Sequence, residues 1–407
     1  MKHLNRWVYA IVGVVVLLFA GLVYAWSVLS TPIAAEFPAW TKAQLSLTFT
    51  LVMIFFCIGS LLCGLLVGKL PAKATVWGSA VLFLVGFLLA SRARSLFMLY
   101  ISFGLMCGLG SGLSYNAVMS TMVRRFPDKP GLISGILLMG FGGGSFLIGK
   151  LYQAWTPTDI GGWRQSFVVM GIIIAAVLVV CSFFFVAPEE TAKASGSANA
   201  PAAVESTPGK TLKTPTFWVY YVWAIVTSAA GLALISQASG VTLEANPAVA
   251  AGSVATIVGL ISIFNAVGRV LFGGIYDRFG RRLSMQGVNA LFILTALILM
   301  VALSQKSVLL VIIGFIVGGL AYSGVTPTNS AFVRAYFGPR YYPINLPLVN
   351  SNLIIASFGS TVSGALFDRS GSYNATFFLI IGLAVVGIAC SLVISVLDRR
   401  AGKQRVR

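Results

Sequence analysis

Charge is scarce in this chain, and negative charge is scarcest. Only 9% of the 407 residues are charged, whereas a soluble domain carries about 25%. The chain is 58% hydrophobic and has a mean hydropathy of +0.93. This composition excludes an ordinary soluble enzyme and predicts an integral membrane protein that crosses the bilayer several times. The net charge of +18 would suggest nucleic-acid binding in a soluble protein, but here the basic loops of a membrane protein explain it, so we expect no nucleic-acid partner.

Histidine and metal-type cysteine spacings are also missing. The single histidine, His3, lies in the N-terminal tail, which rules out a histidine proton relay and a histidine-based metal site. None of the ten Asp and Glu residues lies in the middle of an apolar segment. The cysteines all lie in apolar runs and are interpreted as small core residues: Cys57, Cys63, Cys107, Cys181 and Cys390. We therefore expect no metal, no cofactor and no enzymatic activity.

Long apolar runs fill most of the chain instead. Twelve are long enough to span a bilayer, at about 8–30, 43–68, 74–91, 96–122, 131–154, 165–187, 215–240, 251–276, 283–304, 307–333, 344–367 and 373–397. The first is too long for a signal peptide and is predicted to be a retained helix. Between the sixth and seventh runs lies a segment rich in Ala, Ser, Pro and Lys, which predicts a flexible linker at 188–214. The sequence thus predicts an all-α protein with six-helix bundles at 1–187 and 215–407.

The distribution of Lys and Arg predicts the orientation. If both termini are cytoplasmic, 20 of the 28 basic residues fall on the cytoplasmic side, 7 fall outside, and Arg269 lies in an apolar run. This asymmetry predicts a multi-pass protein with cytoplasmic termini. The short loops favour a bacterial inner membrane, and we expect the monomer to be functional.

Arg269 is the only charged side chain well inside an apolar segment. Arginine cannot lose its proton, and its burial at bilayer depth costs roughly 2.5–3.5 kcal/mol or more. A mobile anion is the simplest compensation, because a guanidinium matches a carboxylate through two parallel hydrogen bonds. Arg269 therefore indicates a protein that moves a small organic anion.

The two halves also resemble each other. The fourth segment ends in GLSYNAVMSTMVRRF (112–126), and the tenth ends in GLAYSGVTPTNSAFVRAYF (319–337). Both place a Gly-Leu-x-Tyr group within a helix and basic residues at its end. Two six-helix halves in parallel register are one known plan of secondary transporters, whose substrate site lies near the middle of the membrane.

A basic loop follows the eighth segment, with the sequence Gly273-Gly274-Ile275-Tyr276-Asp277-Arg278-Phe279-Gly280-Arg281-Arg282. It resembles the G-x-x-x-D-R-x-G-R-R loop of the major facilitator superfamily. The resemblance implies the major facilitator fold, with two pseudo-symmetric bundles of six transmembrane helices. It also implies a gate in which Asp–Arg pairing ties helix ends, with Asp277, Arg278, Arg281 and Arg282 as the candidate residues. The equivalent first-half loop, GLLVGKLPAK at 64–73, lacks the Asp.

Further motifs narrow the resemblance. The sequence RRFPDKPGLISG (124–135) is similar to the basic loop and fifth-helix start of monocarboxylate and oxalate/formate transporters. FNAVGR (264–269) is similar to their eighth-helix arginine motif, and Tyr24-Ala25-Trp26 is similar to a first-helix aromatic motif. The chain departs from animal monocarboxylate transporters at Asn265, where they have Asp, and it has no first-helix lysine. Asn352 stands where the oxalate exchanger has a second buried cation.

These departures favour a monocarboxylate over oxalate, because one fixed positive charge suits one carboxylate. We expect Arg269 to bind the anion, with Asn265 one helical turn away on the same face. Tyr115 and Tyr322 could donate hydrogen bonds to the substrate, and Leu138 could contact its apolar part. The other candidate substrate-binding residues are Asn116, Asn352 and Tyr24.

The sequence therefore predicts a secondary active transporter of small monocarboxylates, lactate- or pyruvate-like, with proton-coupled symport by alternating access. A carboxylate exchanger of the oxalate/formate type is the alternative, because a carrier with a buried Arg269 and no bound anion should resist crossing empty. A non-transporting nutrient receptor on the same fold is a further alternative, but it is disfavoured because such a receptor often has a long signalling tail, and residues 398–407 are too short for one. A drug-cation exporter is disfavoured because a cation would require a buried acid.

Overall fold

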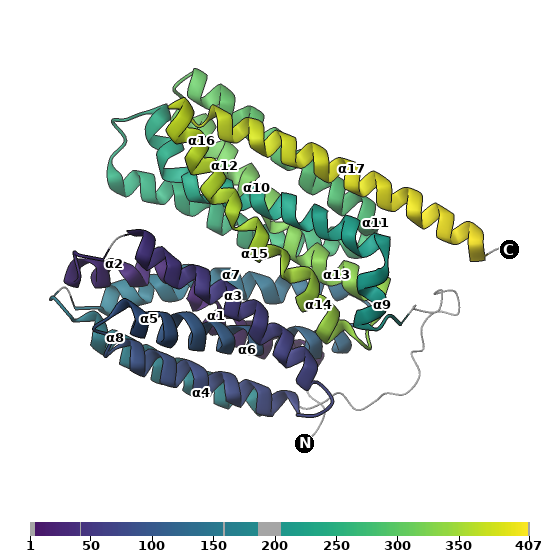
Figure 1. The fold of residues 1–407 in the computed structure, drawn as a ribbon, viewed down its shortest axis with the longest axis horizontal. Helices are drawn as coiled ribbons and strands as arrows, with labels where there is room; N and C mark the ends of the chain where they lie inside the picture. Colours follow the sequence, from purple (N-terminus) through teal and green to yellow (C-terminus); the bar gives the residue numbers. More distant parts are fainter. Residues whose placement is uncertain (1–4, 41, 158, 186–204, 406–407) are drawn as a thin grey trace. The chain divides into compact units, whose positions relative to one another are not determined.

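The computed structural model describes residues 5–40, 42–157, 159–185 and 205–405. Helices make up almost all of these ranges (Figure 1), and the extended structure within them is a single bridge between Val67 and Leu70. The predicted linker at 188–214 lies largely outside the described residues. Its last part is ordered, since a short helix occupies Pro208–Lys213 and the Ser206 N–H donates to the Phe337 carbonyl at 3.0 Å.

The first half of the chain contains six apolar crossings, two of which are interrupted by other helix types. A 3₁₀ segment divides the first crossing, and a π-helix of eight residues lies within the fourth. The elements are α1 (Arg6–Ala20), η1 (Gly21–Ala25), α2 (Trp26–Glu36), α3 (Lys42–Leu66), α4 (Ala72–Ala90), α5 (Leu96–Leu99), η2 (Tyr100–Cys107), α6 (Gly108–Arg125), α7 (Pro130–Trp155) and α8 (Trp163–Ser182).

The second half begins with the short helix α9 and contains longer continuous helices. Its elements are α9 (Pro208–Lys213), α10 (Pro215–Ala245), α11 (Ala251–Ser304), α12 (Val308–Ser323), α13 (Val325–Phe337), α14 (Tyr342–Asn350), α15 (Asn352–Ala356), α16 (Phe358–Ser370) and α17 (Asn374–Arg405).

The apolar helices account for the predicted crossings. Ten helical stretches within the described residues are long and apolar enough to span a membrane. One of them, Thr256–Ser304, has 49 residues. At 1.5 Å per residue it would be about 74 Å long, more than twice the roughly 30 Å of a hydrocarbon core. Gly280, whose φ is 77° and ψ is −177°, breaks it into the two predicted segments. The predicted segment 344–367 is divided among α14, α15 and α16.

The chain forms two compact units. Unit 1 comprises residues 1–128, 136–205 and 338–348, and unit 2 comprises 129–135, 206–337 and 349–407. Helix α7 is therefore divided, since its first turns belong to unit 2 and the rest belongs to unit 1. Most of α14, from Tyr342 to Leu348, likewise belongs to unit 1, although in sequence it follows helices of unit 2.

Several buried polar side chains in unit 2 form hydrogen bonds between helices. The Trp223 indole N–H donates to Asn289 Oδ1 at 3.2 Å, and the Tyr220 hydroxyl donates to Asn329 Oδ1 at 2.9 Å. Asn329 in turn donates to Asn350 Oδ1 at 3.3 Å. Such bonds join transmembrane helices, because lipid offers no alternative partner.

Candidate functional site

Arg269 lies on α11 and is only 9% exposed. Asn265 precedes it by four residues on the same helix, so both side chains lie on one face. The side-chain oxygen Oδ1 of Asn265 is buried and accepts no hydrogen bond from any described residue. A buried acceptor without a donor is costly unless a ligand or water supplies one. This face of α11 thus combines a fixed positive charge with an acceptor that lacks a donor.

Tyr322 on α12 belongs to the same cluster. Its phenol lies within electrostatic reach of the Arg269 guanidinium. Its ring fills the space beside Gly231 of α10, where an added Cβ would lie 2.1 Å from a ring carbon. Helices α11 and α12 approach closely at Gly268, which leaves room for the Ser323 side chain. The structure therefore places Asn265, Arg269 and Tyr322 together within unit 2.

The first turns of α7 run along α11 beside this cluster. A Cβ added to Gly135 would lie 2.2 Å from the Arg269 carbonyl oxygen, and one added to Gly131 would lie 2.5 Å from the Gly273 carbonyl oxygen. Glycine is required for such a close backbone approach. The four-residue spacing on both helices means that one face of α11, from Arg269 through Gly273 to Asp277, packs against the start of α7.

Asp277 caps the start of α7. Its Oδ1 accepts from the Gly131 N–H at 2.8 Å, and its Oδ2 accepts from the Leu132 N–H at 2.7 Å. A helix start leaves its first N–H groups without intrahelical acceptors and carries a partial positive charge. A carboxylate is the best acceptor there. Asp277 thus anchors α7 through backbone atoms, a contact that Asp–Arg pairing did not predict.

The other predicted gating residues have different surroundings. Arg281 is buried and joins three helices, since it donates to the Tyr336 hydroxyl at 2.9 Å and to Asp398 Oδ2 at 3.0 Å. It also donates to Ser395 Oγ at 3.1 Å. Arg278 and Arg282 are exposed. Arg281 therefore holds α11 against α13 and α17 within unit 2.

Two predicted site residues, Asn352 and Asn116, use their amide groups between helices. Asn352 Nδ2 donates to the Ala224 carbonyl at 2.7 Å and to Ser228 Oγ at 2.9 Å, both on α10. Asn116 Nδ2 donates to the carbonyls of Ser60 at 2.7 Å and Pro343 at 2.6 Å. Each keeps one buried side-chain oxygen that makes no hydrogen bond to the described residues. Both residues hold helices together, and their proposed contact with substrate stays a prediction.

The remaining candidates lie in unit 1. Tyr115 on α6 is buried against the rings of Phe56 and Phe141, and Leu138 on α7 is buried. Tyr24 falls within η1, and its side chain lies outside the described part of the structure.

The arrangement suits anion binding better than metal chemistry. Among the described residues, no group of three or more His, Cys, Asp or Glu side chains could hold a metal ion.

Gly131 and Gly135 were not identified from the sequence as packing residues. Asp398 was also not identified as the partner of Arg281. The small-xxx-small spacing of Gly131 and Gly135 was a usable signal for close helix packing. Nothing local marked Asp398, because its partner lies 117 positions away.

Comparison with known proteins agrees with this architecture. The chain is 26% identical over 381 residues to the oxalate:formate antiporter of Oxalobacter formigenes. This alignment covers 92% of the chain and 88% of the relative. The chain is 26% identical over 336 residues to monocarboxylate transporter 13 of Rattus norvegicus, covering 78% and 73%. The crystal structure of a bacterial homologue of the iron transporter ferroportin, in an outward-facing state, superposes with a TM-score of 0.71 at 15% identity, covering 96% and 100%.

The family model described as Major Facilitator Superfamily matches residues 10–345 and 238–406, which together take in nearly the whole chain. This multi-pass membrane protein belongs to the major facilitator superfamily of transporters.

Proposed function

We propose that this transporter carries small monocarboxylates such as lactate or pyruvate, together with a proton, by alternating access. The observation that carries the proposal is Arg269, a permanent charge that is 9% exposed within a stretch of spanning length. Its guanidinium can hold one carboxylate through two parallel hydrogen bonds. A single fixed charge matches a substrate with a single carboxylate. The similarity to a monocarboxylate transporter over 78% of the chain supports the same substrate class.

Asn265 and Tyr322 would complete recognition within unit 2. The Asn265 Oδ1 needs a donor, which the hydroxyl of a 2-hydroxy acid could provide. The Tyr322 phenol lies within electrostatic reach of Arg269, and its hydroxyl would donate to the same carboxylate. Roles for Tyr24, Tyr115, Asn116, Leu138 and Asn352 remain predictions from the sequence. So do the cytoplasmic termini, the inner-membrane location and the monomeric state.

The packing of α7 on α11 suggests how binding could be linked to gating. Gly135 touches the backbone of Arg269, and Asp277 caps the start of α7 two turns further along the same face of α11. We propose that this start of α7 leaves α11 during transport and that neutralisation of Arg269 by substrate permits the movement. Arg281 would keep α11 rigid, while Arg278 and Arg282 would meet acidic lipids or solvent.

The proton has no dedicated carrier in the apolar spans. Every Asp and Glu lies outside the middle of the predicted segments, and the chain has one histidine, in its tail. The proton would therefore travel on the substrate carboxylate, with tyrosines or water as partners. Uptake of labelled L-lactate into proteoliposomes tests this, with and without an inward proton gradient. We expect gradient-driven accumulation, and uptake unaffected by the gradient would contradict symport.

Obligatory exchange is the second candidate function, and one observation favours it. The relative from Oxalobacter formigenes, an antiporter by name, aligns with 92% of this chain. Absence of net uptake, combined with rapid counterflow from liposomes preloaded with unlabelled anion, would identify an exchanger.

Replacement of Asn265 by Asp tests its closeness to Arg269. A carboxylate one helical turn away would pair with the guanidinium and compete with the substrate. We expect uptake at neutral pH to fall about tenfold, the equivalent of about 1.4 kcal/mol. We also expect a steeper rise on acidification, because protonation of Asp would release Arg269. Asn265→Ala is the neutral control, and an unaltered pH profile for Asn265→Asp would count against any role in coupling.

A further inference from the structure

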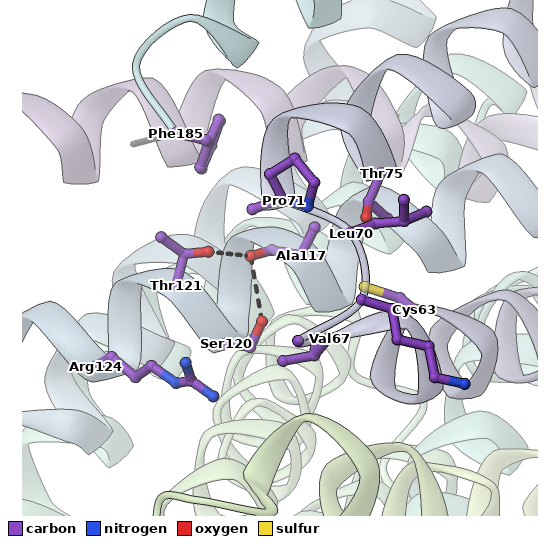
Figure 2. Close-up of a pocket in the computed structure, with 13 residues that line it drawn as sticks. Cys63, Val67, Leu70, Pro71, Thr75, Ala117, Ser120, Thr121, Arg124 and Phe185 are labelled. Carbon is purple, nitrogen blue, oxygen red and sulfur yellow. Dashed lines mark hydrogen bonds between the residues drawn. The ribbon is translucent and has the colours of Figure 1, made fainter. Parts of the chain in front are cut away.

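A cavity of ≈ 470 Å³ lies within unit 1, and none of its lining residues belongs to unit 2. Its walls come from the end of α3, the loop at 67–71, the start of α4, the last turns of α6, and Phe185 beyond α8 (Figure 2). The volume is within the range of roughly 300–1,000 Å³ that is typical of small-molecule sites.

The charges that line the cavity are all positive. Lys69 comes from the loop and Arg124 comes from the end of α6, and no Asp or Glu contributes to the lining. Neither cationic group has a hydrogen bond, ion pair or aromatic partner within the described part of the chain. Two like charges at one cavity repel each other unless an anion lies between them.

The start of α4 adds donors to the same cavity. No side chain caps this helix at Pro71, and the N–H groups of Ala72 and Lys73 have no acceptor among the described residues. Thr75, one turn into α4, lines the cavity and is only 7% exposed, yet its hydroxyl has no described partner. Figure 2 shows the contrast, since Ser120 and Thr121 both donate to the Ala117 carbonyl whereas no hydrogen bond joins Thr75 to another residue drawn. A 19-residue helix directed into the cavity provides the further attraction of its dipole.

The surroundings indicate that the cavity lies at the level of lipid headgroups. The Lys73 ammonium lies over the rings of Phe183 at 3.8 Å and Trp77 at 4.8 Å. Tryptophan with an adjacent lysine is typical of the membrane–water interface. Leu70, which lines the cavity, and Leu65, on the preceding helix, are both exposed apolar side chains. Exposed leucines of a membrane protein can contact acyl chains, which free phosphate does not possess.

We propose that this cavity binds a phosphate group, and that its apolar rim makes the phosphodiester of an anionic phospholipid the occupant. Lys69 and Arg124 supply the charge, and Thr75 and the N–H groups of α4 supply directed hydrogen bonds. Basic pockets between transmembrane helices on the cytoplasmic side suit such headgroups. The proposal depends on neither the substrate nor the direction of transport.

The test measures thermal unfolding of the full-length protein, purified in neutral detergent at low ionic strength. The titrants are short-chain phosphatidylglycerol, short-chain phosphatidylcholine, glycerol 1-phosphate and inorganic phosphate. We expect phosphatidylglycerol to raise the unfolding midpoint of the wild type and the other titrants to have little effect. The double variant Lys69→Gln/Arg124→Gln should need about 30-fold more phosphatidylglycerol for the same shift, since each basic residue contributes about 1 kcal/mol.

Two further variants make the result specific. Lys306→Gln/Arg369→Gln removes the same number of charges at exposed positions elsewhere and should titrate as the wild type does. Thr75→Val, which replaces the hydroxyl by a methyl group of similar size, should weaken phosphatidylglycerol binding about threefold to tenfold. Equal protection of the wild type by inorganic phosphate would overturn the assignment to lipid. Equal stabilisation of the wild type and the Lys69/Arg124 variant by phosphatidylglycerol would overturn the site itself.

Discussion

Arg269→Ala should abolish carrier-mediated uptake of L-lactate while leaving a folded protein. The side chain is buried on α11 and carries the only charge deep within a predicted span. Removal of one partner of a buried, hydrogen-bonded charge pair costs about 2–5 kcal/mol, so uptake should fall at least about 30-fold. The measurement is the initial rate in proteoliposomes with an inward proton gradient.

Two variants show whether charge or geometry is responsible. Arg269→Lys keeps the charge but loses the planar fork, so its uptake should lie between the wild type and the alanine variant. Arg399→Ala, at an exposed position near the end of α17, should transport normally. Uptake by Arg269→Ala at the wild-type rate would contradict the proposed function. Loss of thermal stability in that variant would instead indicate a structural role for the guanidinium.

Asp277→Ala should slow transport about tenfold and lower stability modestly. The carboxylate accepts from the N–H groups of Gly131 and Leu132 at 2.8 and 2.7 Å, and alanine leaves both donors without it. Loss of a helix cap of this kind costs about 0.5–2 kcal/mol of folding free energy. If the transport equilibrium loses about 1.4 kcal/mol from the same contact, the rate of transport falls about tenfold. Initial uptake rates and thermal unfolding midpoints measure the two effects.

Conservative and remote variants separate the gate from general damage. Asp277→Asn keeps one acceptor oxygen and should fall between the wild type and Asp277→Ala. Asp159→Ala removes an exposed carboxylate from a loop and should leave uptake unchanged. If Asp277→Ala transports at the wild-type rate, the contact between α11 and the start of α7 does not limit the transport cycle.

The fold could be predicted because hydropathy reports directly on the need to satisfy backbone hydrogen bonds in lipid. Every predicted apolar segment corresponds to helical structure, including the pair joined at Gly280 and the segment divided among α14, α15 and α16. What hydropathy did not predict is where helices are interrupted. The π-helix at Tyr100–Cys107 has no proline or charge to mark it.

The candidate site could be predicted only in part. Arg269 and Asn265 were predicted as site residues because a charge in an apolar run is rare and because four-residue spacing places both on one face of a helix, as α11 does. The hydrogen bonds that Asn352 and Asn116 make between helices could not be predicted, since a buried side-chain amide can donate equally well to a neighbouring carbonyl or to a substrate. The partners of Asp277 lie 146 and 145 positions away in the chain, and no local pattern specifies a contact over that distance.

Gly280 also makes the turn between two membrane crossings intolerant of changes in length. It is the single residue in α11 with non-helical backbone angles, so no other loop residue separates the two helical segments. Each residue of an α-helix turns by about 100°, and one inserted or deleted residue next to Gly280 would rotate the following crossing by that angle. Asn289, which is now fully buried beside Trp223, would then be turned toward lipid. Natural variation in this loop should therefore consist of substitutions, while insertions and deletions accumulate elsewhere.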